Sequence, residues 1–395
     1  MIFKPTSIST AILLLMVVFQ AEAGQNQHTN KRSELGKQLF FDTNLSNPPG
    51  QSCASCHDPK HGFIDSTVST PTSEGVTAGR FGSRNTPTAM YMAFSPKFHY
   101  DEEEELYIGG QFLDGRAATL EEQAQMPFLN HLEMANTNKQ MVVDKVRSAN
   151  YSKLFKRVFG KHGFDNTEQA YSNIANAIAA FERTEKFNRF TSKYDYYLAG
   201  KARFTEQEEH GLALFEREDK GNCAACHPSQ SGPEGESPLF TDFSYDNLGV
   251  PRNPDNFFYA MSVEYNVEGE AFVDVGLAAN PVVKATGQTE QEKGKIKVPT
   301  LRNVAITGPW MHNGYFQTLQ GVVEFYNTRD VRNVCAEANI TQALAQSKDC
   351  WPMAEVAENV NDSELGNLNL TEDEVQDIVA FLKTLTDGYH PLKNK

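Results

Sequence analysis

Two short segments decide the fold of this chain: Cys53-Ala54-Ser55-Cys56-His57 and Cys223-Ala224-Ala225-Cys226-His227. In both, two residues separate the cysteines and a histidine follows at once, and the two segments lie 170 residues apart. A helix is predicted before each of them, over residues 33–41 and from residue 205 onward, because apolar residues recur there at helical spacing. The repeated order of helix and cysteine pair indicates an internal duplication, in which each half has its own site.

The histidine beside each cysteine pair points to covalently bound haem. In the C-x-x-C-H pattern both thiols add to the vinyl groups of one haem, and the adjacent imidazole binds its iron. A Cys₄ zinc site, a redox-active dithiol and disulfide bonds are the alternatives, but each leaves the adjacent histidines unexplained. The pattern therefore predicts two haem c groups, bound by Cys53, Cys56 and His57 and by Cys223, Cys226 and His227.

The composition limits the class of protein. The chain has 395 residues, 39% hydrophobic and 22% charged, which is enough for two ordinary cores and too long for a small disulfide scaffold. Its 51 acidic and 36 basic residues leave a formal charge of −15, so no nucleic-acid partner is expected. We expect a signal peptide at residues 1–23, an N-terminal haem domain at 24–200 and a C-terminal haem domain at 201–395.

The first 23 residues have the pattern of an export signal. Lys4 precedes an apolar run at residues 11–19, and Ala21 and Ala23 supply the small residues of a cleavage site. This run is too short to cross a bilayer, and no later segment has the ~20 apolar residues that a span needs. We therefore expect a periplasmic protein without a membrane span. An uncleaved signal anchor and a lipid tether are the alternatives.

The rest of the sequence predicts helices joined by long loops. Residues 373–385 have apolar positions at helical spacing, whereas segments such as 66–87 are rich in glycine and proline. Residues 264–298 alternate weakly between apolar and polar, which predicts a short β-hairpin. We expect a disulfide between the remaining cysteines, Cys335 and Cys350, to stabilise a surface insertion by ~3 kcal/mol.

An enzyme that cleaves peroxide also needs an acid–base group, because one peroxide oxygen must lose a proton and the other must gain one. Residues 112–134, FLDGRAATLEEQAQMPFLNHLEM, offer two candidates. Gln123 could orient a bound oxygen, and Glu133 could move the proton. Spacing alone does not separate Glu133 from an ordinary surface glutamate.

Several longer motifs resemble those of the bacterial di-haem cytochrome c peroxidases and their MauG-like relatives. They are LGKQLFFDTNLS before the first cysteine pair, GSRNTPT after it, the segment at 112–134, and VPTLRNVAITGPWMHNGYFQTL after the second pair. The resemblance covers nearly the whole mature chain. It implies a mainly α fold of two cytochrome c-like haem domains, with long connecting loops and at most small β-hairpins.

The resemblance also assigns roles to individual residues. It implies that peroxide reacts at the first haem, in a pocket lined by Glu133 and Gln123. It further implies a calcium ion between the haems, at the positions of Asn85, Thr307 and Pro309. Their oxygen atoms suit this hard cation.

One departure from the family concerns the loop after the first haem motif. In peroxidases that need reductive activation, a histidine in this loop binds the iron until the second haem is reduced. Here Ser73 and Glu74 occupy that place. His61 lies too near the first haem motif to replace the histidine, and His99 lies too far from it. We therefore predict a first haem that is open without activation.

A second departure concerns the far axial ligand of the second haem. Where activatable peroxidases have a methionine, fourteen residues after the position of His312, this chain has Tyr326, as MauG-like proteins do. Tyrosinate is a hard anionic donor that favours oxidised iron. Met311 is the alternative ligand, and Met353 is a more distant one.

These features predict an exported di-haem peroxidase, which reduces hydrogen peroxide with electrons from a small cytochrome c or a copper protein. One alternative is a MauG-like oxidase that modifies an aromatic residue of a partner protein. Tyr326 favours it, whereas Leu113, where the family has a tryptophan between the haems, weakens it and leaves Trp310 as another path for electrons. A non-catalytic di-haem electron carrier is the third hypothesis. The family includes homodimers, but the sequence identifies no interface.

Overall fold

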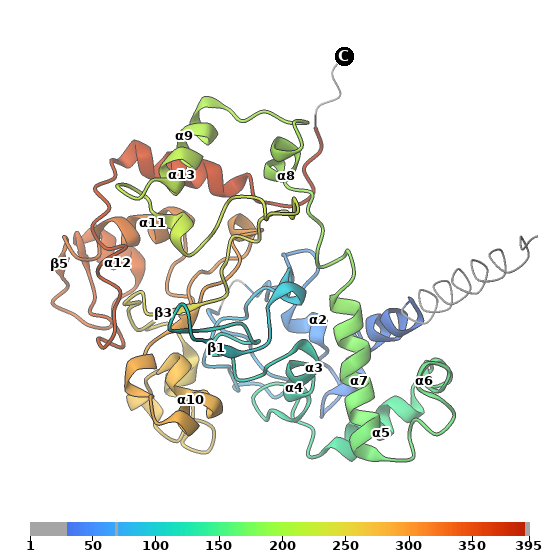
Figure 1. The fold of residues 1–395 in the computed structure, drawn as a ribbon. Helices are drawn as coiled ribbons and strands as arrows, with labels where there is room; N and C mark the ends of the chain where they lie inside the picture. The colour runs from blue at the N-terminus through green and yellow to red at the C-terminus, as the bar shows by residue number, and fades with distance from the viewer. Residues whose placement is uncertain (1–29, 68–69, 392–395) are drawn as a thin grey trace, which may run out of the picture.

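A computed structural model describes residues 30–67 and 70–391 of the chain. The predicted signal peptide at 1–23 lies outside the described residues. Within them the chain is mainly helical with three small two-stranded sheets, which confirms the predicted fold class (Figure 1). No helix of this described part is long and apolar enough to cross a membrane.

The helices fall into two groups along the chain. After a helical segment at residues 30–40, the first half contains α2 (Cys53–Cys56), α3 (Leu120–Gln123), α4 (Met126–Leu129), α5 (Lys139–Ser148), α6 (Ser152–Phe159) and α7 (Thr167–Glu182). The second half contains α8 (Lys193–Leu198), α9 (Glu206–Glu216), α10 (Pro281–Thr286), α11 (Leu319–Thr328), α12 (Gln342–Ser347) and α13 (Glu372–Lys383). In Figure 1, α5, α6 and α7 lie at the lower right, and α9, α11 and α13 at the upper left.

Each half is built on two helices that cross at a glycine. A Cβ atom on Gly36, in the helix at 30–40, would lie 1.8 Å from the carbonyl oxygen of Ala177 in α7. A Cβ atom on Gly211, in α9, would lie 1.9 Å from the carbonyl oxygen of Asp377 in α13. Only glycine allows backbones to approach this closely. The same contact in both halves supports the predicted duplication.

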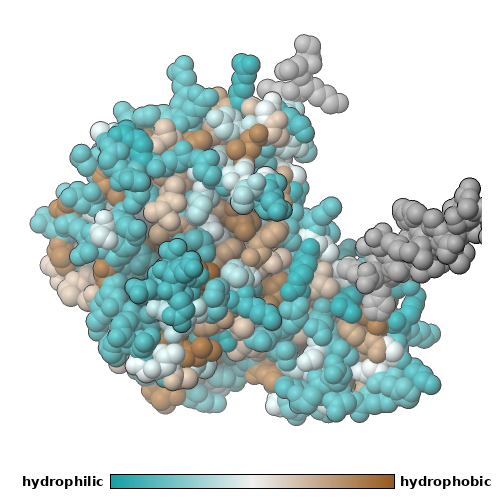
Figure 2. Space-filling model, viewed as in Figure 1, coloured by the Kyte–Doolittle hydropathy of each residue, from teal (hydrophilic) through white to brown (hydrophobic). Residues whose placement is uncertain are grey.

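Polar caps and apolar faces explain why these helices form where they do. Thr205 and Thr371 each cap a helix with a capping box, which confirms the predicted helix start at Thr205. The two largest clusters of buried apolar side chains lie between residues 35 and 187 and between residues 194 and 385. The face drawn in Figure 2 is largely hydrophilic and is interrupted by small hydrophobic areas, several of them near the middle of the view.

The sheets are short and mostly join distant segments. The pairs are β1 (His99–Asp101) with β2 (Leu106–Ile108), β3 (Tyr245–Asp246) with β4 (Ile296–Lys297), both antiparallel, and β5 (Asn333–Val334) with β6 (Cys350–Trp351), parallel. The hairpin predicted inside residues 264–298 is wrong. Asn280 caps α10 there, with a proline at the helix start, and β4 pairs with a strand outside the segment. The predicted disulfide between Cys335 and Cys350 is confirmed.

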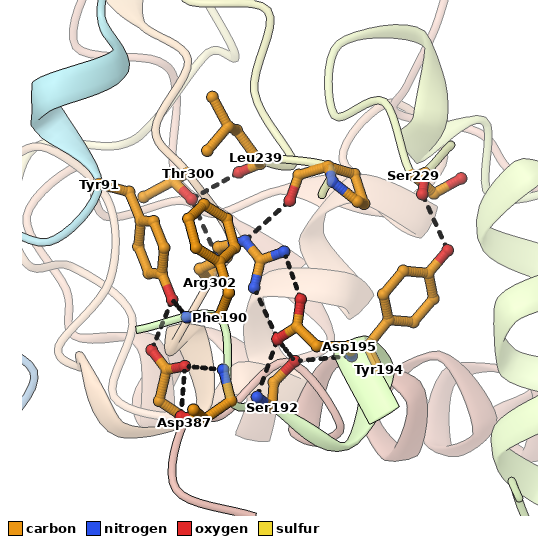
Figure 3. Close-up of polar contacts among 12 residues, drawn as sticks. Tyr91, Phe190, Ser192, Tyr194, Asp195, Ser229, Leu239, Thr300, Arg302 and Asp387 are labelled. Carbon is orange, nitrogen blue, oxygen red and sulfur yellow. Dashed lines mark hydrogen bonds and ion pairs between the residues drawn. The ribbon is translucent and has the colours of Figure 1, made fainter. Parts of the chain in front are cut away.

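A buried polar network ties the halves together (Figure 3). Arg302 is fully buried, and its guanidinium donates to both carboxylate oxygens of Asp195, at 2.9 and 3.1 Å. Nearby, Asp387 accepts hydrogen bonds from the Tyr91 hydroxyl and from the backbone N–H of Thr191. Tyr91 belongs to the first half, so the C-terminal segment is fastened to it through polar contacts.

We expect Asp195→Asn to lower the free energy of unfolding by about 3–5 kcal/mol, because it leaves the buried Arg302 guanidinium without its counter-charge. Chemical unfolding of the two proteins measures the difference. Asp165→Asn is the control, because Asp165 pairs with His162 on the surface and both side chains are more than half exposed. A loss below 1 kcal/mol for Asp195→Asn would show that water or another group replaces the carboxylate.

Candidate functional site

One cavity of about 720 Å³ is lined by residues of both halves. The first cysteine pair forms the two ends of α2. In the second pair, Cys223 begins a short 3₁₀ turn at Cys223–Ala225, and Cys226 follows it. The residues predicted from sequence that line this cavity are Cys53, Cys56, His57, Asn85, Gln123, Glu133, Cys223, Cys226, His227, Thr307, Pro309, Met311 and Tyr326. The fold thus brings these predicted site residues around one cavity.

The two histidines are held in the same way. Nδ1 of His57 lies 2.9 Å from the carbonyl oxygen of Phe63, and Nδ1 of His227 lies 2.8 Å from that of Phe240. A carbonyl oxygen only accepts, so each Nδ1–H donates and each Nε2 keeps its lone pair. Burial lowers the pKa of both imidazoles, which keeps them neutral. A neutral imidazole with a fixed Nδ1–H is the form that binds a metal ion.

The four paired cysteines are free thiols, and all four are half-buried. Burial raises the pKa of Cys56 to about 12, and it raises the pKa of the other three thiols as well. A redox-active dithiol needs a lowered pKa, so this environment argues against that alternative. Among the described residues, no group of three or more His, Cys, Asp or Glu side chains could hold a metal ion, which argues against the Cys₄ zinc alternative. Thiols and neutral imidazoles facing a shared cavity fit two haem c groups.

Glu133 and Gln123 face the first half of the cavity. Asn130 donates a hydrogen bond of 2.8 Å to Oε1 of Glu133. Burial raises the pKa of this carboxyl, although Asn130 and Arg116 partly oppose the shift. Gln123 ends α3, whose N-terminus is capped by the Thr119 hydroxyl. Glu133 is therefore a half-buried carboxyl at the cavity wall, held in place by an amide, as a proton-transferring group requires.

The loop that replaces the family's capping histidine supplies no imidazole. The Ser73 hydroxyl lies 2.5 Å from that of Thr86, and the exposed Glu74 accepts a hydrogen bond from a backbone N–H. His61 and His99 are both exposed, bond to surface neighbours and do not line the cavity. The five-coordinate state of the first haem stays a prediction.

In the second half, Tyr326 extends from α11 into the cavity. Burial raises the pKa of its hydroxyl, and the thiols of Cys223 and Cys226 act in the same direction, which indicates that they lie close to it. This hydroxyl has no hydrogen-bond partner in the part of the chain that the structure describes. Met311 also lines the cavity, whereas Met353 is 64% exposed and lies outside it. Met353 is thus poorly placed as a ligand.

The residues expected to hold calcium also lie at the cavity wall. The backbone N–H of Asn85 donates to the carbonyl oxygen of His312 at 2.7 Å, and its side-chain amide donates to that of Pro71 at 2.8 Å. Because these contacts use its donors, the side-chain oxygen of Asn85 is available as a ligand. Thr307 and Pro309 line the same cavity.

Lys297 and Glu182 are among the buried ionisable residues of the cavity that were not predicted. Lys297 donates to the carbonyl oxygen of Gly110 at 2.8 Å, and burial lowers its pKa to about 7. It could pair with a carboxylate of a bound cofactor. Glu182 lines the first half, and its position in the sequence could have revealed it: it follows Ile174 and Ile178 on the apolar face of α7.

Comparisons with known proteins agree on one family. The model of the family described as di-haem cytochrome c peroxidase matches residues 30–203. The chain is 40% identical to the methylamine utilization protein MauG of Paracoccus denitrificans, over 91% of this chain and 89% of that protein. It is 31% identical to the cytochrome c551 peroxidase of Nitrosomonas europaea, over 90% of this chain and 79% of that protein.

A solved structure gives the same result. The diheme peroxidase BthA from Burkholderia thailandensis is similar to this chain with a TM-score of 0.74 and 33% identity, over 90% of this chain and 86% of that one.

Proposed function

The chain belongs to the family of di-haem cytochrome c peroxidases and MauG proteins, and from this premise we propose that it reduces hydrogen peroxide in its N-terminal half, with electrons relayed through its C-terminal half. The observation that carries the proposal is that the carboxyl of Glu133 lines the same cavity as His57, whose Nε2 is free to bind iron. Peroxide cleavage requires an acid–base group beside an iron that has a protein ligand on one side only.

Two covalently bound haem c groups complete the proposed site. Each would be anchored by one cysteine pair and held by the adjacent histidine, His57 or His227. When bound, haem supplies an iron at which peroxide can be reduced. The carbonyl of Phe63 keeps the His57 ring in one tautomer and one orientation.

In the proposed mechanism Glu133 moves a proton between the two oxygen atoms of the substrate. Its ionised carboxylate takes the proton from one oxygen and returns it to the other as water forms. Asn130 keeps Oε1 in position, and Gln123 orients the substrate from the end of α3. The raised pKa of Glu133 means that its carboxylate takes the proton more readily than that of an exposed glutamate would.

The C-terminal half would carry electrons rather than react with peroxide. His227 and Tyr326 are the proposed ligands of its iron, with Met311 as the alternative. We propose a calcium ion at Asn85, Thr307 and Pro309, because oxygen atoms that suit this cation line the cavity there. Export to the periplasm, a small cytochrome c or copper-protein donor and a homodimer complete the proposal.

We expect the purified holoprotein to oxidise a reduced small cytochrome c when hydrogen peroxide is added, because reduction of one peroxide consumes two electrons. Stopped-flow absorbance of the donor measures the rate, and the same mixture without peroxide is the control. The oxidised protein should also show a high-spin component in its spectrum. No donor oxidation together with two purely low-spin haems would instead indicate the electron carrier.

A MauG-like oxidase, which modifies an aromatic residue of a partner protein, is the second candidate. The 40% identity to a MauG protein and the cavity position of Tyr326 favour it, whereas Leu113 at the cavity wall weakens it. Mass spectrometry of exported proteins from cells with and without the gene distinguishes the two functions. A protein whose mass changes only when the gene is present would favour the oxidase, because a peroxidase leaves no covalent mark on its donor.

A further inference from the structure

Glu182 is a buried carboxyl to which the mechanism above gives no role. It ends α7, is 8% exposed, and lines the cavity together with Ile178 one turn earlier. Its Oε2 is buried without a hydrogen-bond partner among the described residues. After burial, the charge of Glu182 is the largest influence that raises the pKa of the Cys53 thiol, so its carboxyl lies close to the first haem attachment site.

The second half has a leucine at the equivalent position. The helix at 30–40 meets α7 at Phe181, and α9 meets α13 at Phe381, in each case beside the glycine where the helices cross. The residue after each phenylalanine is therefore equivalent, and these residues are Glu182 and Leu382. Both line the cavity, and Leu382 is 5% exposed. The fold accepts an apolar side chain at this place, so packing alone does not require the acid.

Glu182 is held in its protonated form. Burial raises its pKa to about 8, the charge of Glu121 acts in the same direction, and Arg183 opposes them. An apolar residue would avoid the cost of burying an unpartnered carboxyl. At this equivalent position the chain has an acid in the half that is proposed to react with peroxide and a leucine in the other half.

Glu121 and Arg183 form an ion pair between Glu182 and the surface, and their charges act on the Glu182 carboxyl. Nη1 of Arg183 lies 2.6 Å from Oε1 of Glu121, and their side chains are 44% and 33% exposed. Glu121 belongs to α3, which ends at Gln123 in the cavity wall. Ionisable groups thus extend from solvent, through the Glu121–Arg183 pair, to the buried carboxyl.

Reduction of one hydrogen peroxide to two waters consumes two electrons and two protons. Glu133 returns the proton that it takes, so it supplies neither of these protons. We propose that Glu182 transfers protons from solvent, past the Glu121–Arg183 ion pair, to the N-terminal part of the cavity. In each transfer the Glu182 carboxyl loses a proton to the cavity and regains one from the surface side, so the protein is unchanged. This inference rests on the proposed function.

Steady-state kinetics of the holoprotein test the inference through Glu182→Gln and Glu182→Leu. Both variants should lower kcat for peroxide by about 100-fold, with an unchanged KM for peroxide, because neither side chain can carry a proton. The leucine variant is expected to fold, because the second half has a leucine at the equivalent position. Glu168→Gln is the matched control: Glu168 is also on α7, its side chain is 71% exposed, and kcat should not change.

A second measurement does not depend on activity. Folded protein holds the Glu182 proton up to a pH of about 8, whereas an unfolded chain releases it near 4.5. The free energy of unfolding of the wild-type holoprotein should therefore fall as pH rises between these values, and both variants should reduce this fall. Wild-type kcat in Glu182→Leu, or an unchanged pH dependence of unfolding, would overturn the inference. A wild-type protein that does not reduce peroxide would overturn the proposed function as well.

Discussion

Glu133→Gln should lower the turnover of hydrogen peroxide by about 10²- to 10⁴-fold, while the absorption spectra of both haems stay those of the wild type. Glutamine keeps the size of the side chain and the contact with Asn130, but it cannot take a proton from peroxide. Donor oxidation by peroxide measures the effect. Glu104→Gln, at an exposed glutamate of the β1–β2 turn, is the control and should keep full turnover.

The pH dependence gives the same prediction a second test. Burial raises the pKa of Glu133 above its ordinary value of 4.5, and the reaction needs the ionised form to accept a proton. Wild-type turnover should therefore fall as pH drops toward and below this raised pKa, and Glu133→Gln should remove that dependence. Turnover within twofold of the wild type in the variant would exclude Glu133 as the acid–base group.

Local patterns in the sequence account for much of the site. The order of cysteines and histidine predicts which side chains share a haem, because attachment is a contact between residues near in sequence. The capping box at Thr205 and the helical spacing at 373–385 predict helix positions for the same reason. Counting from His312 led to Tyr326, which lines the cavity.

Contacts between distant segments account for what the sequence did not reveal. The pairing of β3 with β4 joins residues about 50 positions apart, and weak alternation in 264–298 gave no sign of it. Nothing in the local sequence distinguishes Lys297 from an exposed lysine. Its burial depends on the contact with Gly110, which is distant in the sequence. Glu182 interrupts the apolar face of α7. The comparison with Leu382 is what shows that packing at this position does not require an acid.

Tyr326→Met should raise the reduction potential of the second haem by on the order of a few hundred millivolts. A tyrosinate ligand favours oxidised iron, whereas a thioether favours reduced iron. Tyr326 lines the cavity beside the second cysteine pair, and its hydroxyl has no hydrogen-bond partner in the described part of the chain, so a metal ion would supply that partner. A spectroscopic redox titration of both proteins measures the shift.

Met311→Leu is the matched variant, because Met311 is the alternative ligand and lines the same cavity. If Tyr326 binds the iron, Met311→Leu leaves the potential of the second haem within a few tens of millivolts of the wild type, on the scale over which axial ligands act. If Met311 binds it, the results are reversed: Met311→Leu exposes a high-spin iron, and Tyr326→Met changes little. The pair thus identifies the ligand, and with it whether the second haem is suited to hold an oxidising equivalent or only to pass electrons on.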